Sequence, residues 1–243
     1  MNARPTRFSS AVFATKAALL RAHRSLTDIA NPVPRHSQYA DTSFPFLAAQ
    51  SITPLWTDES PSEQWYQRSK VENLRLAAAR LDNCHIPAGQ TFSFWRQVGK
   101  ATARKGYQRG RMLQEGCMIP AVGGGLCQLS NALYQVALDS GCTILERHRH
   151  SRLVPGSATA ANRDATVAWN YIDLRFRPPA DMQLCVELTA EQLTVSLRSN
   201  VATSRPLPII ESPPPPIGPD HACDTCGQTD CFRQHSHAEI ERL

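Results

Sequence analysis

The chain has 243 residues, of which 42% are hydrophobic and 19% are charged, and its formal net charge is +5. This composition is typical of a globular protein with one well-buried domain plus appendages, and it excludes a wholly disordered chain. The positive charge is modest and no nucleic-acid-binding motif accompanies it, so we expect no nucleic-acid partner.

The first 58 residues are predicted to form a helix followed by an irregular arm. Residues 7–28 are rich in Ala and Leu with Arg and Lys on the polar side, which indicates a helix, whereas residues 31–56 are punctuated by proline and show no usable period. Arg21 and Arg24 interrupt the most hydrophobic part of the helix, so neither a secretory signal nor a membrane span is predicted. We therefore expect a cytoplasmic protein; the alternative is that the basic helix touches a membrane surface.

A second helix is predicted to start at Ser60-Pro-Ser-Glu63, where a Ser cap, a Pro and a Glu follow one another in the order typical of helix starts. Its apolar positions continue to about Asp82. Residues 91–95 are rich in aromatic side chains and predict a short strand. The glycines between residues 99 and 110 then predict turns and loop.

Three consecutive glycines, Gly123, Gly124 and Gly125, come directly before a helical pattern that ends at Gly141. This pattern places Cys127 at or near the first turn of the helix. Unpaired backbone N–H groups and the positive end of the helix dipole stabilise a thiolate at such a position. Cys127 is therefore a candidate nucleophile.

The pattern after Gly141 changes from helical to strand-like. Strands are predicted at residues 143–150, 165–176, 183–188 and 193–198, and the last two form a hairpin through residues 189–191. A helix followed by consecutive strands indicates an α+β fold, in which the helix carrying the GGGLCQ motif packs on a mainly antiparallel sheet.

A cysteine nucleophile requires a base to take its proton and an acceptor to orient the base, and Cys127, His150 and Asp164 supply these groups in chain order. On a strand His148 would project to the same face as His150, so it is an alternative base. We favour His150 because it is nearer the loop at which Asp164 begins. The order is similar to that of papain-like and transglutaminase-like enzymes and predicts a thiol hydrolase or acyltransferase that acts on an amide or peptide bond. The competing interpretation is a small buried Cys127 beside fixed hydrogen bonds.

A non-catalytic function is the second hypothesis for the same stretch. Here Gly123, Gly124, Gly125 and Gln128 would form a ligand-binding cradle at the helix start, suited to a phosphate or a carboxylate. The chain would then be a ligand-binding or scaffold protein.

The C-terminal part is predicted to be a proline-rich linker, residues 201–220, followed by a metal-binding tail, residues 221–243. Cys223, Cys226, Cys231 and His235 have the spacing of a tetrahedral zinc knuckle. His221 and His237 are alternative nitrogen ligands, and an iron–sulfur cluster is the less favoured alternative because it would be exposed to solvent. So short a segment cannot build a core, which makes it a candidate module for a protein partner.

The five cysteines outside the tail are scattered rather than paired in the sequence: Cys84, Cys117, Cys127, Cys142 and Cys185. This distribution does not indicate a disulfide framework, and together with the metal-like tail it favours a reducing compartment.

Several of these motifs, in this order, resemble the VanW family: residues 73–81, 87–94 (PAGQTFSF), 98–99, 106–107, 122–130 (VGGGLCQLS), 146–151 (ERHRHS) and 163–167 (RDATV). The resemblance spans roughly residues 73–197 and places a VanW-like α+β domain at residues 59–200. It implies a bacterial protein linked to cell-wall or glycopeptide-resistance biology, without specifying a reaction or a substrate.

Overall fold

The computed structural model describes residues 6–38, 43–114, 117–150, 162–202 and 209–211. Within these residues the strands form sheets of five, three and two strands, and every strand pair is antiparallel except the parallel pair of β1 with β10. The expectation of an α+β fold with mainly antiparallel sheets is confirmed.

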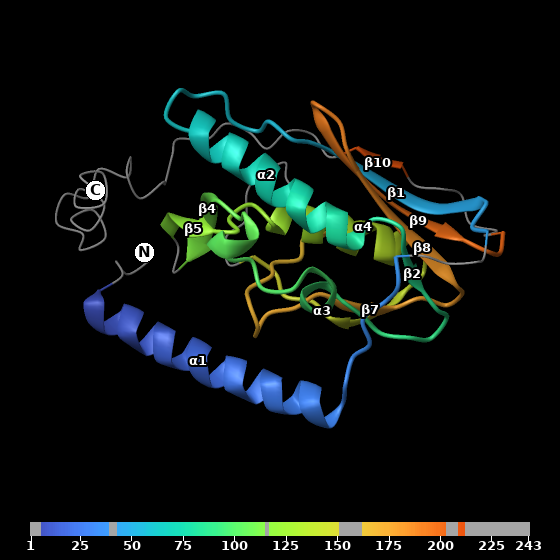
Figure 1. The fold of residues 1–243 in the computed structure, drawn as a ribbon, viewed down its shortest axis with the longest axis horizontal. Helices are drawn as coiled ribbons and strands as arrows, with labels where there is room; N and C mark the ends of the chain where they lie inside the picture. The colour runs from blue at the N-terminus through green and yellow to red at the C-terminus, as the bar shows by residue number, and fades with distance from the viewer. Residues whose placement is uncertain (1–5, 39–42, 115–116, 151–161, 203–208, 212–243) are drawn as a thin grey trace.

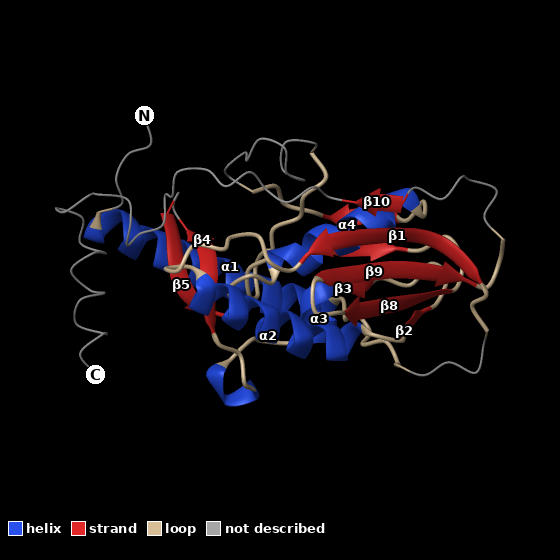
Figure 2. Cartoon of the chain, turned by 90° about the horizontal axis from the view of Figure 1, so that it is seen from above, coloured by secondary structure: helices blue, strands red, loops and turns tan. Residues whose placement is uncertain are grey.

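The five-stranded sheet has the order β10-β1-β9-β8-β2 (Figures 1 and 2). Its strands are β1 (Phe46–Pro54), β2 (Cys84–Ile86), β8 (Met182–Leu188), β9 (Gln192–Ser199) and β10 (Ile209–Glu211). The predicted hairpin is the β8–β9 pair, with Leu188 opposite Leu193 and Met182 opposite Ser199. Alternate side chains of these strands are buried, so one face of the sheet forms the core.

Two helices cover this core. Helix α4 (Cys127–Asp139) packs against β1 and β9. Helix α2 (Gln64–Leu81) packs against β8 and against the two-stranded sheet described below. Leu74 of α2, Leu133 of α4 and Leu184 of β8 are fully buried in a single hydrophobic cluster. Helix α4 ends as the sequence predicts, because Gly141 has a φ of 77° and the N–H of Cys142 bonds back to the carbonyl of Ala137 at 2.9 Å.

The remaining described strands form two smaller sheets. The three-stranded sheet contains β3 (Phe92–Ser93), β6 (Thr143–Glu146) and β7 (Arg175–Arg177), with α3 (Phe94–Val98) and a 3-10 turn (Ala103–Lys105) following β3. The two-stranded sheet is the hairpin of β4 (Arg109–Gln114) and β5 (Cys117–Val122), which leads directly into the glycine triplet.

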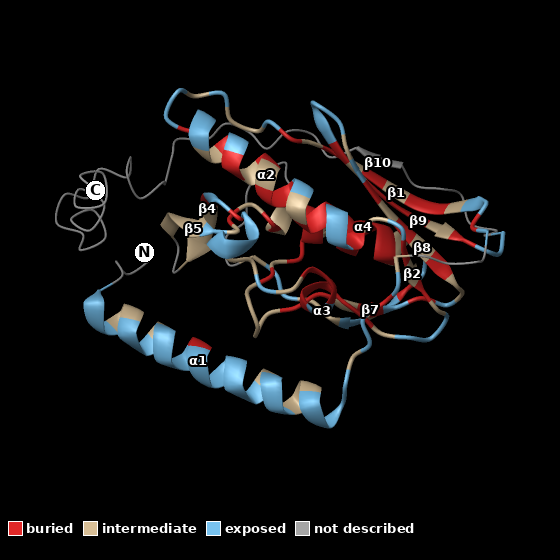
Figure 3. Cartoon of the chain, viewed as in Figure 1, coloured by how far each residue is buried: buried red, intermediate tan, exposed pale blue. Residues whose placement is uncertain are grey.

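Helix α1 (Arg7–Ala30) lies along the outside of the molecule, and only Ala17 of its 24 residues is buried (Figures 1 and 3). Ion pairs attach its C-terminal half to the three-stranded sheet: the guanidinium of Arg24 donates to both carboxylate oxygens of Glu146 at 2.7 and 2.5 Å, and Arg175 donates to both oxygens of Asp28 at 2.9 and 3.0 Å. None of the described helices is both long enough and apolar enough to cross a bilayer.

Strand β1 is the main departure from the predicted organisation. It is a central strand of the largest sheet, although the sequence places it in an irregular arm before residue 59. The apolar alternation is hidden because Ser51 and Thr53, both buried, are polar. Their hydroxyls are satisfied within the protein, Ser51 by Gln135 at 3.1 Å and Thr53 by Gln128 at 3.0 Å. The folded body therefore begins before the predicted boundary.

Other elements also differ from their predictions. Strand β10 lies inside the predicted linker, the β4–β5 hairpin replaces a predicted loop, and the aromatic stretch at residues 91–95 is a two-residue strand followed by α3. The sequence Ser60-Pro-Ser-Glu63 forms a turn rather than a capped helix start. The reason is that the carboxylate of Glu63 pairs with the guanidinium of Arg111 on β4 instead of reaching back to the chain end.

Candidate functional site

The start of α4 is held by a close contact between two glycines. A Cβ atom on Gly124 would lie 2.2 Å from both the carbonyl carbon and the oxygen of Gly110, so only glycine fits there. Asn73, fully buried on α2, donates from Nδ2 to the carbonyls of Gly124 (2.9 Å) and Gln108 (3.0 Å) and accepts the N–H of Gln108 (2.8 Å). The loop before Cys127 is thereby fixed to α2 and to the chain next to β4.

Two of the residues predicted to cradle a ligand are packed against the protein's own chain. Gly125 has a φ of 93°, and a Cβ there would lie 2.3 Å from the Lys70 side chain. The side-chain amide of Gln128 donates to Thr53 Oγ1 at 3.0 Å and to the Pro54 carbonyl at 2.8 Å. These contacts give both residues a role in positioning α4, and ligand binding by Gly123, Gly124, Gly125 and Gln128 stays a prediction.

His150 and Asp164 are joined by two hydrogen bonds to one carboxylate oxygen. Oδ2 of Asp164 lies 2.7 Å from Nδ1 of His150 and also accepts the His150 backbone N–H at 2.7 Å. Asp164 is 1% exposed. A buried carboxylate on Nδ1 fixes the imidazole ring and leaves Nε2 as the nitrogen that faces another partner.

Arg147 holds the other side of the same aspartate. Its Nη2 donates to Asp164 Oδ1 at 2.8 Å and its Nε donates to the Asp164 backbone carbonyl at 2.6 Å. The guanidinium also lies over the ring of Tyr134 on α4, 4.9 Å from the ring centroid. Both oxygens of Asp164 are therefore engaged, which is the condition for a stable buried carboxylate.

Helix α4 is attached directly to the segment that carries Asp164. Ser130 donates from its hydroxyl to the Ala165 carbonyl at 2.5 Å, and Asn131 Oδ1 accepts the Ala165 N–H at 2.8 Å. One residue further on, Thr166 Oγ1 lies 3.6 Å from Cys127 Sγ. The first turn of α4 thus brings the thiol and the His150–Asp164 pair into one cluster.

The electrostatics of the cluster favour a thiolate beside an imidazolium. Burial opposes ionisation of Cys127, but a side-chain hydrogen bond from His150 and the charge of His150, with smaller help from the Val167 backbone and Thr166, outweigh it and lower the pKa of Cys127 below 9.0. Burial likewise opposes charging of His150, but its contacts with Cys127 and then with Asp164 raise its pKa above 6.5.

His148, the alternative base, lies elsewhere. Its Nε2 is 3.4 Å from Glu146 Oε1 and its side chain is 47% exposed. The prediction that residues 143–150 form one strand is wrong, because β6 ends at Glu146 and His148 keeps a single bridge to Thr166. The two histidines therefore do not share a strand face, and the cluster contains His150.

Sequence reasoning missed the residues that support this cluster: Asn73, Arg147, Ser130, Asn131 and Thr166. All but Asn131 lie within the short motifs at residues 73–81, 122–130, 146–151 and 163–167, yet their roles depend on contacts between distant segments. Asn131 carried a usable signal, because it lies one helical turn after Cys127 and so had to share its face.

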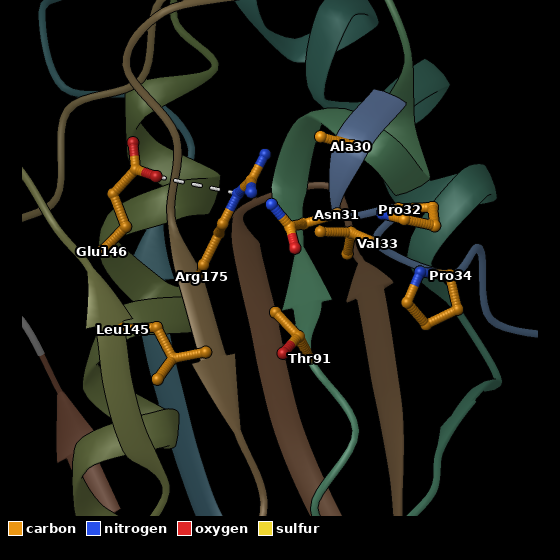
Figure 4. Close-up of a pocket in the computed structure, with 9 residues that line it drawn as sticks. All are labelled: Ala30, Asn31, Pro32, Val33, Pro34, Thr91, Leu145, Glu146 and Arg175. Carbon is orange, nitrogen blue, oxygen red and sulfur yellow. Dashed lines mark ion pairs between the residues drawn. The ribbon is translucent and has the colours of Figure 1, made fainter. Parts of the chain in front are cut away.

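The predicted metal ligands Cys223, Cys226, Cys231 and His235 lie outside the described residues, so the zinc knuckle stays a prediction. Among the residues that the structure does describe, no group of three or more His, Cys, Asp and Glu side chains could hold a metal ion. A cavity of about 600 Å³ lies at the C-terminal end of α1 (Figure 4), and Cys127 is not among the residues that line it. Glu146 and Arg175 line this cavity and form an ion pair with each other.

Comparison with known proteins matches residues 69–199 to the model of the VanW like protein family. The chain is 35% identical over 164 residues to the vancomycin B-type resistance protein VanW of Enterococcus faecalis, covering 64% of this chain and 60% of that protein. It is 37% identical over 110 residues to the uncharacterized protein YoaR of Bacillus subtilis, covering 45% of this chain and 36% of YoaR. It thus spans less than two thirds of the length of either curated relative.

No solved structure matches the chain. The family match covers more than half of the sequence, including every residue of the cluster around Cys127. On this evidence the chain belongs to the VanW-like family.

Proposed function

We propose that Cys127, His150 and Asp164 are the nucleophile, the general base and the orienting carboxylate of a thiol-dependent hydrolase or acyltransferase that acts on an amide or peptide bond. The observation that carries this proposal is geometric: Asp164 Oδ2 lies 2.7 Å from Nδ1 of His150 in the same cluster as Cys127, whose Sγ is 3.6 Å from Thr166 Oγ1. The contact between Cys127 and His150 lowers the pKa of the thiol and raises the pKa of the imidazole, which supports the same assignment. A buried thiol with only a structural role has its pKa raised instead, as burial does for Cys142, to about 11.

The proposed reaction begins with attack of the Cys127 thiolate on the carbonyl carbon of the amide. The oxygen of the tetrahedral intermediate gains a negative charge, which the positive end of the α4 dipole favours; the donor that we propose is the backbone N–H of Cys127, since the N–H groups of Gln128 and Leu129 already donate to Gly125 and Leu126. The His150 imidazolium then gives its proton to the leaving nitrogen, the C–N bond breaks and a thioester on Cys127 remains. Water, deprotonated by His150, completes hydrolysis, whereas an amine in its place completes acyl transfer.

Asp164 has a positioning role in this scheme. Its Oδ2 fixes the ring through Nδ1 and the backbone of His150, and its negative charge favours the imidazolium that forms in each half-reaction. Arg147 holds the remaining oxygen, so the carboxylate cannot rotate away from the ring without losing an ion pair.

The biological setting that we propose is the bacterial cell wall. The E. faecalis relative is named as a vancomycin B-type resistance protein, and the amide bonds of cell-wall peptides are the substrate class that combines such a setting with a thiol nucleophile. The substrate proposed here is therefore a peptide related to the cell wall.

The competing hypothesis, a ligand cradle in a non-catalytic scaffold, has less support. The backbone of Gly124 is packed on Gly110 and the space next to Gly125 is filled by the stem of Lys70. The close contacts of the glycine triplet are thus explained by packing of the protein's own chain, without a bound anion.

The proposal is tested by trapping the thioester. The full-length protein is incubated with cell-wall peptides, quenched in acid and digested, and the peptide containing Cys127 is examined by mass spectrometry for an acyl adduct. We expect an acyl adduct on Cys127 in wild-type protein, and hydroxylamine should remove this adduct because it cleaves thioesters. No adduct should form in Cys127→Ala or His150→Ala.

A matched control is Cys117→Ala, which removes another partly exposed thiol outside the cluster and should leave the adduct unchanged. If the resistance phenotype of cells carrying the protein is the same with Cys127→Ala as with wild type, the scaffold hypothesis is favoured and the enzymatic one is contradicted.

A further inference from the structure

Helix α1 presents an apolar stripe that none of the other described residues covers. Positions separated by alternating steps of four and three residues lie on one side of an α-helix. In α1 these positions are all exposed: Phe8, Val12, Thr15, Leu19, Ala22, Leu26 and Ile29. Phe8 is 78% exposed and Ile29 is 77% exposed, so the stripe is open at both ends.

The opposite side of α1 is attached to the body. Ala17 is its one buried residue. Arg24 and Asp28 follow Ala17 by seven and eleven residues and so lie on the same side of the helix, where they form the ion pairs with Glu146 and Arg175. Figure 3 shows the helix exposed along nearly its whole length, on the side of the molecule away from α2. The ion pairs fix which face of α1 points outward, and that face is the apolar one.

The charges around the stripe are positive. The segment from Met1 to Thr27 contains no acidic residue, and Arg7 and Lys16 are exposed. The single carboxylate of α1, Asp28, is engaged by Arg175. A second copy of α1 laid on the stripe would offer no acidic side chain to these cations, whereas an anionic surface complements both the apolar residues and the charge.

We propose that α1 docks the protein on the surface of a membrane containing anionic lipid. The helix lies in the plane of the interface, with Phe8, Leu19 and Leu26 inserted among the upper acyl chains and with Arg7 and Lys16 at the level of the phosphates. The ion pairs of Arg24 and Asp28 hold the body of the protein on the aqueous side. This inference is independent of the chemistry proposed for Cys127.

The test is flotation of the full-length protein with vesicles of phosphatidylcholine, with and without 30% phosphatidylglycerol. We expect binding to the anionic vesicles that weakens as salt is added, and Leu19→Glu should lower the affinity at least ~10-fold. Arg7→Glu combined with Lys16→Glu should lower it by at least ~10-fold as well. All three positions are exposed, so the thermal unfolding of these variants should match that of wild type.

Two variants on α2 serve as controls. Trp65→Glu removes an apolar side chain that is 55% exposed, and Arg68→Glu combined with Arg75→Glu makes the same charge change as the α1 pair. Both should leave vesicle binding unchanged, because α2 lies on the far side of the molecule from α1 (Figure 1).

Absence of vesicle binding, or equal loss in the α1 and α2 variants, would overturn the proposal. Sedimentation equilibrium without lipid tests whether the stripe instead binds a second copy of the chain. A monomer supports membrane docking, whereas a dimer that Leu19→Glu dissociates, in a protein that does not float with vesicles, assigns the stripe to a second copy and overturns it.

Discussion

Asp164 Oδ2 accepts two hydrogen bonds from His150, one from the ring Nδ1 and one from the backbone N–H, both at 2.7 Å. The ring and the backbone of one residue are thus bound to a single buried oxygen. This arrangement fixes the direction of the imidazole more firmly than a ring contact alone, and it leaves the opposite ring nitrogen for the contact with Cys127.

The buried ion pair of Asp164 predicts a large loss of stability on its removal. Asp164→Ala leaves the Arg147 guanidinium without its carboxylate in a site where the side chain of Arg147 is 13% exposed, and such losses cost about 3–5 kcal/mol. Urea denaturation measures the change. The control is Asp139→Ala, whose partner Arg163 is 32% exposed and whose loss should cost no more than about 1 kcal/mol. Equal losses for the two variants would contradict the assigned role of Asp164.

The close approach of Gly124 and Gly110 predicts that Gly124→Ala is severely destabilising. The new Cβ would meet backbone atoms at 2.2 Å, and backbone cannot rotate aside as a side chain can, so we expect a loss of about 3 kcal/mol or more together with a displaced Cys127. Gly89→Ala is the matched control, because Gly89 has a φ of 71° but nothing within 4 Å of the added Cβ. It should cost only the backbone strain of about 1–2 kcal/mol. Thermal unfolding of the two variants decides the point.

Lys70 predicts a pH dependence with a definite sign. Burial, partly offset by the charge of Asp58, lowers the pKa of Lys70 from 10.5 to about 8. Between these two values the unfolded chain binds the proton and the folded chain does not, so this group makes stability rise with pH through that window and destabilises the fold at lower pH. Lys70→Met keeps the stem against Gly125 and removes the charge.

The difference in unfolding free energy between wild type and Lys70→Met isolates this contribution from the other groups that titrate in alkali. We expect Lys70→Met to be more stable than wild type by about 2–3 kcal/mol at pH 7, with the advantage shrinking between pH 8 and 10.5. An advantage that is constant from pH 7 to 10.5 would show that the charge of Lys70 is not the cause.

The sequence indicates the helix start at Cys127 more readily than the sheet that supports it. Cys127 could be placed because glycines and a 3.6-residue period are local signals, and His150 and Asp164 could be proposed because the chemistry of a thiol requires them. Strand β1 could not be recognised, because Ser51 and Thr53 occupy core positions and their hydrogen-bond partners on α4 are more than seventy residues away in the sequence. Tertiary contacts, rather than local pattern, decide such a strand.

The same limit applies to the residues that support the cluster. Arg147 directly precedes the two candidate histidines in a basic stretch, and only its contacts with Asp164 and Tyr134 distinguish it from Arg149. Glu63 illustrates the opposite error. Its spacing from Ser60 fits a helix cap, but a pairing with Arg111 across to β4 takes its carboxylate instead.

The C-terminal cysteines predict a bound metal. We expect elemental analysis of protein purified without chelator to find about one zinc per chain, because Cys223, Cys226, Cys231 and His235 supply four ligands of the type zinc prefers. Cys223→Ser combined with Cys226→Ser should abolish the zinc and leave the unfolding of the VanW-like domain unchanged. Zinc that persists in the double variant, or iron with acid-labile sulfide in wild type, would contradict the zinc knuckle.

The most direct measurement of the central claim is the pH dependence of Cys127 alkylation by iodoacetamide, followed site by site with mass spectrometry and with Cys117 as the internal reference thiol. Since the contact with His150 lowers the pKa of Cys127, wild-type Cys127 should react at a rate that stays high well below pH 9.0. In His150→Ala the largest contacts that oppose the burial of Cys127 are removed and only the smaller ones with Val167 and Thr166 remain, so the profile should move to higher pH. Identical profiles in wild type and His150→Ala would contradict the thiolate–imidazolium pair on which the proposed function depends.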